Sequence, residues 1–268
     1  MTLTVRNLAV RYGRKTVIDG LYADALPGAL TAIVGPNGSG KSTLIKAMCG
    51  DLPYDGTITL NGIDVFRAQP WELAAVRGVL PQTSTLAFPF HAIEVVKIGL
   101  TSGTEADHEG RASAALARVG LAGYANRYYQ ELSGGEQQRV QLARVLAQVW
   151  APATASGPNW LMLDEPVSSL DIAHQLQVMR IAQNFARAGG GVVAVMHDLN
   201  LTGLFADQVL VMAEGQVLAA GRPADVMTDR VLSRAYGCDL RVNTAPQGMA
   251  PFVLPHSIDA SGNAGFAE

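Results

Sequence analysis

The sequence predicts an α/β protein in which a core of parallel strands and helices follows an antiparallel β layer and holds a helical insertion. Two short apolar runs, 160–164 and 192–196, are each followed by a helix-length segment, and strands that alternate with helices favour a parallel sheet. Residues 3–12 alternate apolar and polar side chains, as a half-buried strand does. From about 84 to 150 the pattern is helical, which predicts a helical subdomain inserted into the core.

The composition sets limits on the class of protein. The chain has 268 residues, of which 49% are hydrophobic, so it can bury a sizeable core in one large domain or in one with an inserted subdomain. The net charge of −3 lacks the basic excess that nucleic-acid binding usually shows. Cys49 and Cys238 lie in unrelated contexts, which predicts neither a disulfide framework nor a metal site and fits a reducing cytosol. The N-terminus does not read as a signal peptide and no apolar run approaches the ~20 residues of a membrane span, so we expect a soluble chain that reaches a membrane only through a partner.

Turn residues divide the first half of the chain into short elements. Val17, Ile18 and Leu21 indicate a second strand that ends before Pro27-Gly28. The apolar, β-branched run 30–34 predicts a buried strand, and a helix is expected over 42–49, with Gly50 as its stop. Beyond it we expect a turn at 55–56, a strand at 57–60, a hairpin turn at Asn61-Gly62, one or two helical turns over 70–77, and a strand over 78–82 that ends in Gln82.

The second half is predicted to begin with helices and to end with strand–helix units. Helices are expected over 93–100, 107–119 and 134–150, and the small, proline-bearing segment 151–159 is expected to be a loop. The strands at 160–164 and 192–196 lead into helices at about 171–188 and 199–206, and a hairpin at 208–213 and 216–221 turns at Glu214-Gly215. The predicted domain is therefore 1–242, and the tail over 243–268, rich in Gly, Ala, Ser and Pro, is expected to be loosely ordered.

One stretch carries the first chemical signal. Residues 35–43 read G-x-x-x-x-G-K-[ST], a phosphate-binding loop, and they stand between a predicted strand and a predicted helix, which a chance glycine turn would not explain. Glycines let the backbone wrap a phosphate, and the loop N–H groups and the helix N-terminus direct partial positive charge at it. Lys41 is expected to reach the β- and γ-phosphates, and Ser42 to ligate Mg²⁺. The predicted nucleotide-binding residues are Gly35, Pro36, Asn37, Gly38, Ser39, Gly40, Lys41, Ser42 and Thr43. The fold class narrows to an α/β P-loop NTPase with a RecA-like core.

Two adjacent carboxylates end the apolar run 160–164. In P-loop NTPases an aspartate at the end of such a strand holds Mg²⁺, and Asp164 matches it. Neighbouring side chains at a strand end point in different directions, so Glu165 is the candidate general base for the water that attacks the γ-phosphate. Alone, an Asp-Glu pair is as often a solvated strand end, but the phosphate-binding loop favours the functional interpretation.

A second anion site is predicted at 132–139, which reads Leu-Ser-Gly-Gly-Glu-Gln-Gln-Arg. Ser133, Gly134 and Gly135 stand at a helix start, where free N–H groups attract anions. A capping box of Ser133 and Glu136 is the alternative, but it does not explain two adjacent glycines, which weaken a helix start. One phosphate-binding loop and a second phosphate-type site together predict a dimer, in which the 133–136 segment of each subunit closes on the ATP of the other.

With these motifs in this order, the chain resembles the ATP-binding cassette (ABC) ATPases over residues 3 to about 240, and the Leu-Ser-Gly-Gly-Glu stretch is highly specific to them. The resemblance implies that Tyr12 stacks on adenine, that Gln82 senses Mg²⁺ and the γ-phosphate, and that His197 contacts the γ-phosphate. It also implies that Asp171 lies in a loop that crosses the dimer interface, although Asp171 is equally expected to cap the next helix. Family members usually have Thr after Glu-Pro where this chain has Val167, and we expect little loss of activity from it.

The resemblance extends to a class of machine. A single cassette without membrane spans is similar to the detached ATPase of a bacterial importer. The segment 88–96 resembles that of importers for iron–siderophores, cobalamin and haem, and 151–159 resembles haemin-importer ATPases. Haem is therefore the first candidate substrate, and ferric siderophore or cobalamin is the alternative.

The implied machine has several parts. It is a homodimer that uses ATP and Mg²⁺, with a permease dimer in the membrane and a periplasmic or lipoprotein substrate-binding protein, and this chain would lie at the cytoplasmic face of the inner membrane. A nucleic-acid-acting ABC ATPase is the alternative from another class, but such proteins usually carry two cassettes, coiled coils or basic insertions. A GTPase is disfavoured because no Asn-Lys-x-Asp motif follows the loop.

Overall fold

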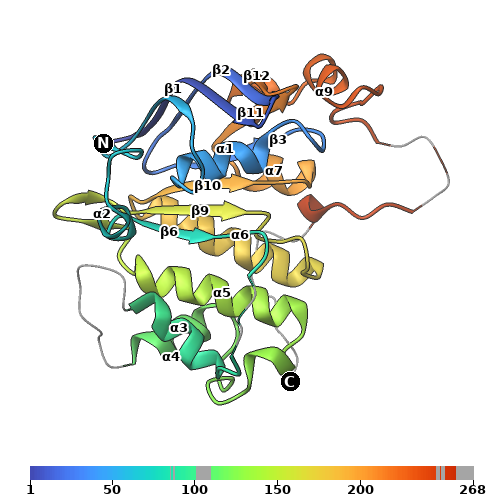
Figure 1. The fold of residues 1–268 in the computed structure, drawn as a ribbon. Helices are drawn as coiled ribbons and strands as arrows, with labels where there is room; N and C mark the ends of the chain where they lie inside the picture. Colours follow the sequence, from blue (N-terminus) through green and yellow to red (C-terminus); the bar gives the residue numbers. More distant parts are fainter. Residues whose placement is uncertain (85, 87, 101–109, 246–247, 249–250, 258–268) are drawn as a thin grey trace.

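The computed structural model describes residues 1–84, 86, 88–100, 110–245, 248 and 251–257 (Figure 1). Its core is a six-stranded sheet in the order β12-β11-β3-β10-β9-β6. The strands are β3 (Leu30–Val34), β6 (Arg77–Leu80), β9 (Trp160–Asp164), β10 (Gly191–Val195), β11 (Gln208–Ala213) and β12 (Gln216–Gly221). All pairs are parallel except β11–β12, so the predicted α/β fold class and the final hairpin are confirmed.

A four-stranded antiparallel sheet, in the order β2-β1-β4-β5, covers this core. Its strands are β1 (Leu3–Tyr12), β2 (Lys15–Ala25), β4 (Asp55–Leu60) and β5 (Ile63–Asp64). The turn expected at 55–56 is wrong, because both residues begin β4. There β4 passes an irregular point of β1, where Asn7 has φ 50°, and a Cβ on Gly56 would lie 2.4 Å from the Asn7 carbonyl oxygen. The hairpin at Asn61-Gly62 is confirmed, with φ of 55° and 87°, as a two-residue turn of the favoured type requires.

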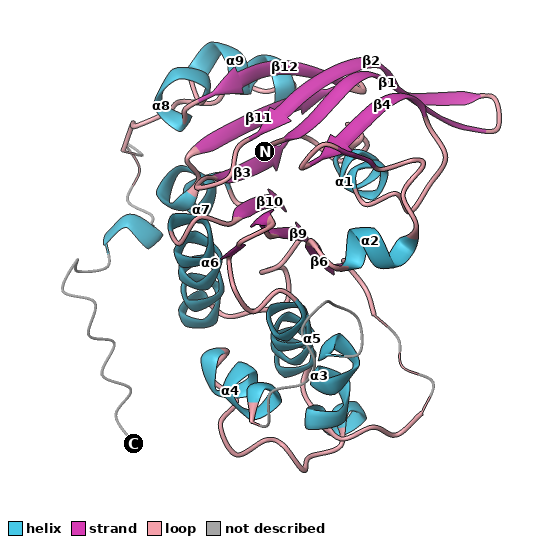
Figure 2. Ribbon diagram, turned by 90° about the vertical axis from the view of Figure 1, so that its left-hand side faces the viewer, coloured by secondary structure: helices cyan, strands magenta, loops and turns pink. Residues whose placement is uncertain are grey.

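Two apolar cores lie on the two faces of the parallel sheet, because successive side chains of a strand point to opposite faces. One face packs on the antiparallel sheet and on α1 (Lys41–Met48) through Ile33, Trp160, Met162, Val193, Val195 and Leu210. The other packs on α6 (Ile172–Arg187) and α7 (Leu199–Phe205) through Leu30, Ala32, Leu161, Leu163, Val192 and Ala194. Figure 2 shows α6 and α7 on one side of the sheet and α1 on the other.

A group of helices lies below the sheet in Figure 1. It comprises α3 (Ala92–Leu100), α4 (Arg111–Arg118), the 3-10 turn η1 (Tyr129–Glu131) and α5 (Gly134–Gln148), and α5 packs on α3, on α4 and on strand β6. Of the helix expected over 107–119, residues 107–109 lie outside the described residues. The helical turns expected over 70–77 form only α2 (Pro70–Ala74), and the strand expected over 78–82 ends at Leu80. Gln82 therefore lies in the loop that follows, not at the strand end.

The other differences from the sequence predictions lie at surface elements. The loop expected at 151–159 contains a small hairpin, β7 (Ala153–Thr154) and β8 (Gly157–Pro158). Two helices, α8 (Pro223–Val226) and α9 (Asp229–Tyr236), pack on β11 and β12 and were not predicted. In the tail, η2 (Pro255–Ser257) lies against α7, whereas 246–247, 249–250 and 258–268 lie outside the described residues. Within the described ranges, no helix combines the length and apolar character needed to cross a membrane.

Candidate functional site

The phosphate-binding loop connects the end of β3 to the start of α1. Gly35, Gly38 and Gly40 have φ of 151°, 81° and 99°, values that residues with a side chain rarely adopt. A Cβ on Gly35 would also lie 2.1 Å from the carbonyl oxygen of Met212 in β11. The loop therefore keeps its shape only with glycine at these positions, and it leaves the N-terminal N–H groups of α1 free for an anion.

Two polar side chains of the loop are arranged as a phosphate site requires. Lys41 is buried, and its Nζ donates to the carbonyl oxygens of Gly35 (2.8 Å) and Pro36 (2.9 Å). Burial lowers the pKa of Lys41, and the nearby charges of Glu165 and Asp164 oppose that shift. The Ser39 hydroxyl is buried without a hydrogen-bond partner among the described residues. Because buried polar groups are normally satisfied, a phosphate that offers oxygen acceptors fits both groups.

Ser42 and Asp164 form an oxygen-donor pair beside this loop. The strand order places β10 between β3 and β9, so the carboxyl ends of these strands lie together, and Ser42 Oγ donates to Asp164 Oδ1 at 3.3 Å. Burial and the charge of Glu165 raise the pKa of Asp164, which the hydrogen bond from Ser42 partly offsets. Hydroxyl and carboxylate oxygens suit Mg²⁺, which commonly takes one or two carboxylates together with substrate phosphates and water. Within the described ranges no cluster of three or more His, Cys, Asp or Glu side chains could hold a metal, so this pair would need phosphate oxygens to complete the shell.

Glu165 and His197 form the second pair at this edge of the sheet. Glu165 Oε1 lies 2.6 Å from His197 Nε2, and the exposed fractions of the two side chains are 14% and 44%. The Glu165 backbone has φ 55°, a left-handed conformation that is uncommon for this residue type. Asp164 thus faces Ser42 whereas Glu165 faces His197, so the two carboxylates point to different partners, as expected.

Two further predicted residues lie on the surface. Tyr12 ends β1 with 53% of its surface exposed. Gln82 is exposed in the loop after β6. Both side chains are open to a ligand, and neither is held by the apolar cores.

The predicted capping box is present at the start of α5. Ser133 donates through its N–H and its hydroxyl to Glu136 Oε2, both at 2.8 Å, and the Glu136 N–H donates to Ser133 Oγ at 3.3 Å. These bonds lower the pKa of Glu136. They do not account for the glycines. A Cβ on Gly134 would meet no atom within 4 Å, whereas one on Gly135 would lie 3.1 Å from the Ser169 carbonyl oxygen.

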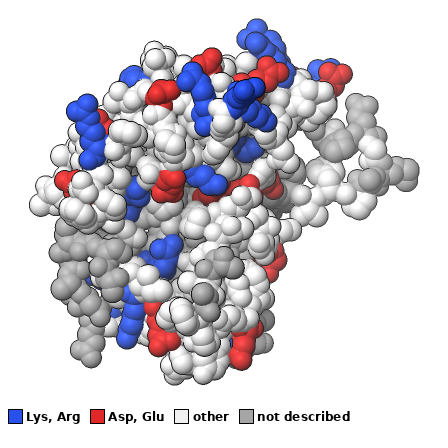
Figure 3. Space-filling model, in the orientation of Figure 1, with Lys and Arg blue, Asp and Glu red and all other residues white. Residues whose placement is uncertain are grey.

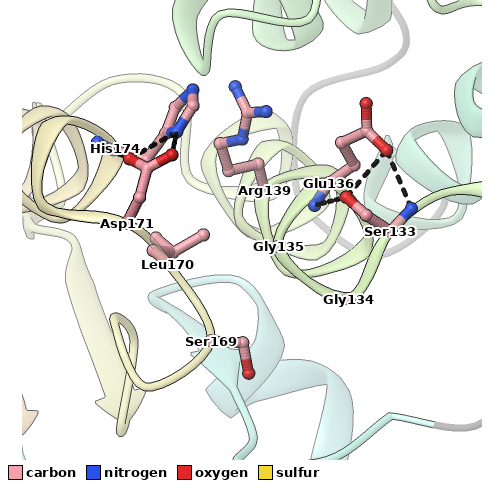
Figure 4. A pocket seen from close by; sticks show the side chains of 9 residues that line it. All are labelled: Ser133, Gly134, Gly135, Glu136, Arg139, Ser169, Leu170, Asp171 and His174. Atoms are coloured by element: carbon pink, nitrogen blue, oxygen red, sulfur yellow. Dashed lines mark hydrogen bonds and ion pairs between the residues drawn. The ribbon is translucent and has the colours of Figure 1, made fainter.

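An open pocket of about 430 Å³ joins this helix start to the loop before α6 (Figure 4). It is lined by Ser133, Gly134, Gly135, Glu136, Arg139, Ser169, Leu170, Asp171 and His174. Asp171 caps α6 by accepting from the His174 N–H (2.9 Å), and its carboxylate oxygens lie 2.8 and 2.9 Å from His174 Nδ1, which lowers the pKa of Asp171. The lining includes none of residues 35–43. Within one chain, the phosphate-binding loop and the 133–136 segment are therefore separate sites.

Three residues at these sites had no assigned role in the sequence analysis, although two of them, Gln138 and Arg139, lie in the predicted stretch 132–139. His174 and Arg139 line the pocket, and Gln138 donates from α5 to the carbonyl oxygen of Glu165. The position of His174, three residues after the helix cap Asp171, could have indicated its contact with Asp171. Nothing in the local pattern indicates the contacts of the other two.

The chain is similar to known ATP-binding proteins over nearly its whole length. Residues 18–168 match the protein family described as ABC transporter. The chain is 60% identical over 262 residues to the hemin import ATP-binding protein HmuV of Jannaschia sp. (strain CCS1), which covers 98% of this chain and 97% of that protein. It is 56% identical over 254 residues to the hemin import ATP-binding protein HmuV of Rhizobium meliloti (strain 1021), and the match covers 94% of this chain and 97% of that protein.

Solved structures show the same fold. The ADP conformation of MJ1267, an ATP-binding cassette of an ABC transporter, superposes with a TM-score of 0.71 and 25% identity over 88% of this chain and 98% of that one. The structure of cbiO1 from Clostridium perfringens, part of the ABC transporter complex cbiONQ, superposes with a TM-score of 0.72 and 27% identity over 87% of this chain and 92% of that one.

Proposed function

Because the chain belongs to the ABC transporter family, we propose that it is the ATP-hydrolysing subunit of an importer for hemin. The observation that carries the ATPase part is the phosphate-binding loop beside Asp164, Glu165 and His197, with a second anion-type site elsewhere on the chain. Support for hemin comes from near-full-length relatives that are named hemin import ATP-binding proteins. In this proposal residues 1–242 form the ATPase domain, with the helices of about 84–150 as its insertion.

The residues of the loop would hold ATP and Mg²⁺ together. Lys41, Ser39 and the N-terminus of α1 bind the phosphates, and Tyr12 stacks on the adenine. Ser42 and Asp164 would hold Mg²⁺, with Gln82 as a further oxygen ligand. A bound ion would neutralise charge on the phosphates, whereas the glycine-built shape of the loop would align them.

Glu165 and His197 would then carry out the proton transfer. Water attacks the γ-phosphorus, the bond to the bridging β–γ oxygen breaks, and ADP and phosphate are formed. Glu165 takes the proton of the attacking water, while His197, at 2.6 Å, keeps the carboxylate oriented. Glu165 contacts His197 whereas Asp164 accepts from Ser42, so the base and the metal ligand have separate partners.

A second copy of the chain would complete each site. Since the 133–136 segment and the phosphate-binding loop are separate within one chain, Ser133, Gly134, Gly135 and Glu136 of each copy close on the ATP of the other, with Asp171 at the interface. This closure would move a permease dimer attached at the cytoplasmic face of the inner membrane, and a periplasmic or lipoprotein hemin-binding protein would deliver the cargo. The net charge of the chain is −3, and acidic and basic side chains are interspersed on the described part of the face in Figure 3, so neither shows the basic excess typical of nucleic-acid binding.

Substitution of the general base tests the ATPase proposal. Glu165→Gln should lower kcat by about 10² to 10⁴ while ATP still binds, because only the proton acceptor is removed. Glu214→Gln is the matched control, since Glu214 is an exposed glutamate with φ 50° in the β11–β12 turn. A Glu165→Gln chain that turns over as fast as Glu214→Gln would remove Glu165 as the base.

Reconstitution with the permease in lipid vesicles tests the cargo. ATPase activity should rise when a hemin-loaded binding protein is added and should be unchanged by DNA. A response to a siderophore-loaded or cobalamin-loaded binding protein, with none to hemin, would reject hemin as the substrate and leave the ATPase proposal in place.

A further inference from the structure

A side chain from α5 contacts the backbone of the general base. Gln138 Nε2 donates a hydrogen bond of 2.9 Å to the carbonyl oxygen of Glu165. The same oxygen accepts from Ser168 Oγ at 3.3 Å, and the Glu165 N–H donates to the Val195 carbonyl oxygen at 3.2 Å. Glu165 is thus held at both ends of its backbone, while its carboxylate contacts His197 at 2.6 Å.

The backbone held in this way is strained. A φ of 55° is uncommon for a glutamate, and such conformations persist only where surrounding contacts impose them. Rotation of the Glu165 peptide would carry the carboxylate away from His197. The Gln138 bond, at 2.9 Å, is the shortest of three bonds to the carbonyl oxygen that oppose this rotation; the other two come from the Ser168 hydroxyl (3.3 Å) and the Ser168 N–H (3.4 Å).

Packing alone does not explain a glutamine at position 138. Its Oε1 is buried without a hydrogen-bond partner among the described residues, and a buried acceptor without a partner destabilises the fold. A methionine of similar length would fill the same space without that penalty. What glutamine supplies here, and methionine does not, is the N–H donor to Glu165.

The neighbouring glutamine provides a comparison. Gln137 is equally half-buried, and its Nε2 donates to the carbonyl oxygens of Tyr129 (3.0 Å) and Leu132 (3.1 Å). Its bonds are of the same chemical type, but they hold the segment before α5. They do not involve Glu165.

We infer that Gln138 is a positioning residue for hydrolysis. Its hydrogen bond connects α5, the helix that begins at the 133–136 segment, to the general base of the same chain. Gln138 lies five positions after Ser133, about 7 Å along α5. A shift of α5 when a phosphate docks at its N-terminus therefore reaches the Glu165 carbonyl oxygen through one side chain. The inference rests on the proposed function, because it takes Glu165 as the base and the 133–136 segment as a nucleotide contact.

The matched pair Gln138→Met and Gln137→Met tests this role in the full chain. Each variant loses a glutamine donor and keeps the length of the side chain. We expect Gln138→Met to lower kcat by about 10- to 100-fold, the effect of misplacing a reacting group by about an ångström. The KM for ATP, the affinity for a fluorescent ATP analogue and the Tm should match those of Gln137→Met. In single-turnover experiments on the Glu165→Gln background, adding Gln138→Met should lower the residual rate no further.

Several results would overturn the inference. A kcat for Gln138→Met within twofold of that for Gln137→Met would do so, as would equal losses of ATP affinity and kcat, or an additive loss on the Glu165→Gln background. A wild-type chain that binds ATP but does not hydrolyse it, even with its permease, contradicts the proposed function itself. An active wild type with an unaffected Gln138→Met contradicts only the role of Gln138.

Discussion

Substitution of Gly134 by alanine separates the folding role of the α5 N-terminus from its role toward a ligand. A Cβ at this position would meet no atom within 4 Å, and the glycine has no left-handed φ, so nothing in the chain opposes the methyl group. Alanine is the better helix former by up to about 1 kcal/mol, which for a domain of this size raises the Tm by at most about 2–4 °C. The same methyl group would stand beside the free N–H groups of α5, where a phosphate of the second copy is expected. We therefore expect a chain at least as stable as the wild type whose ATP turnover falls about 10²-fold.

Gly135→Ala is the control for this experiment. Its Cβ would lie 3.1 Å from the Ser169 carbonyl oxygen and from Leu170 Cδ2, so the loop before α6 must shift by a few tenths of an ångström, which opposes the gain in helix propensity. Gly135→Ala should therefore have a lower Tm than Gly134→Ala, while both variants lose turnover. Calorimetry and steady-state phosphate release at saturating ATP measure the two quantities. Wild-type turnover by Gly134→Ala would show that no ligand approaches this face and would refute the reasoning.

Three other outcomes are expected. Gly99→Ala in α3 would place a Cβ 2.2 Å from a carbonyl oxygen of α5 and should lower the free energy of unfolding by about 1–3 kcal/mol. Gly203→Ala in α7 is the control, because the nearest neighbour of its Cβ would lie at 3.8 Å. Equal shifts of the two variants in chemical denaturation would contradict this. Burial raises the pKa of Asp164 above its ordinary 3.8, so the folded chain loses stability as the pH rises from 3.8 through the raised pKa. The Tm of Asp164→Asn should therefore exceed that of the wild type by more at pH 7 than at pH 4, and the variant should bind Mg²⁺ more weakly. A Tm difference that does not depend on pH would contradict this. Burial also raises the pKa of the Cys49 thiol to about 12. A thiol reagent should therefore react with the exposed Cys238 alone in the native chain and with both cysteines in denaturant. Fast reaction of both thiols in the native chain would disprove the burial of Cys49.

Most of the fold could be predicted because its signals are local. Strand alternation, buried apolar runs and the turn pairs Asn61-Gly62 and Glu214-Gly215 each depend on a few consecutive residues, and the structure confirms these elements. The turn expected at Asp55-Gly56 failed because β4 is paired there with β1, at an irregular point set by Asn7. A contact between residues that far apart in the chain leaves no local pattern.

The end of the chain shows a different kind of failure. Helices α8 and α9 have ordinary boundary signals, with Pro223 in the first turn of one, and Thr228 and Gly237 bounding the other. No helix was predicted over these residues, although α9 has the same eight residues in length as α1, which was predicted, so these boundary signals were enough to locate it. Gln82 lies in a loop and not at a strand end, because β6 ends where its pairing with β9 ends, at Leu80.

For the site, the sequence alone determined which residue types stand in which motifs: the glycine loop with Lys41 and Ser42, the Asp164-Glu165 pair, and the helix start at 133–136. Only the tertiary structure decided how they meet. The strand order that places β10 between β3 and β9 brings Ser42 to Asp164 across 122 positions of the chain, and His197 to Glu165 across 32. It also separated the 133–136 pocket from the phosphate-binding loop and placed Gln138 on the Glu165 backbone. The physical reason is that hydrogen bonds act over about 3 Å of space, whereas a motif records only spacing along the chain.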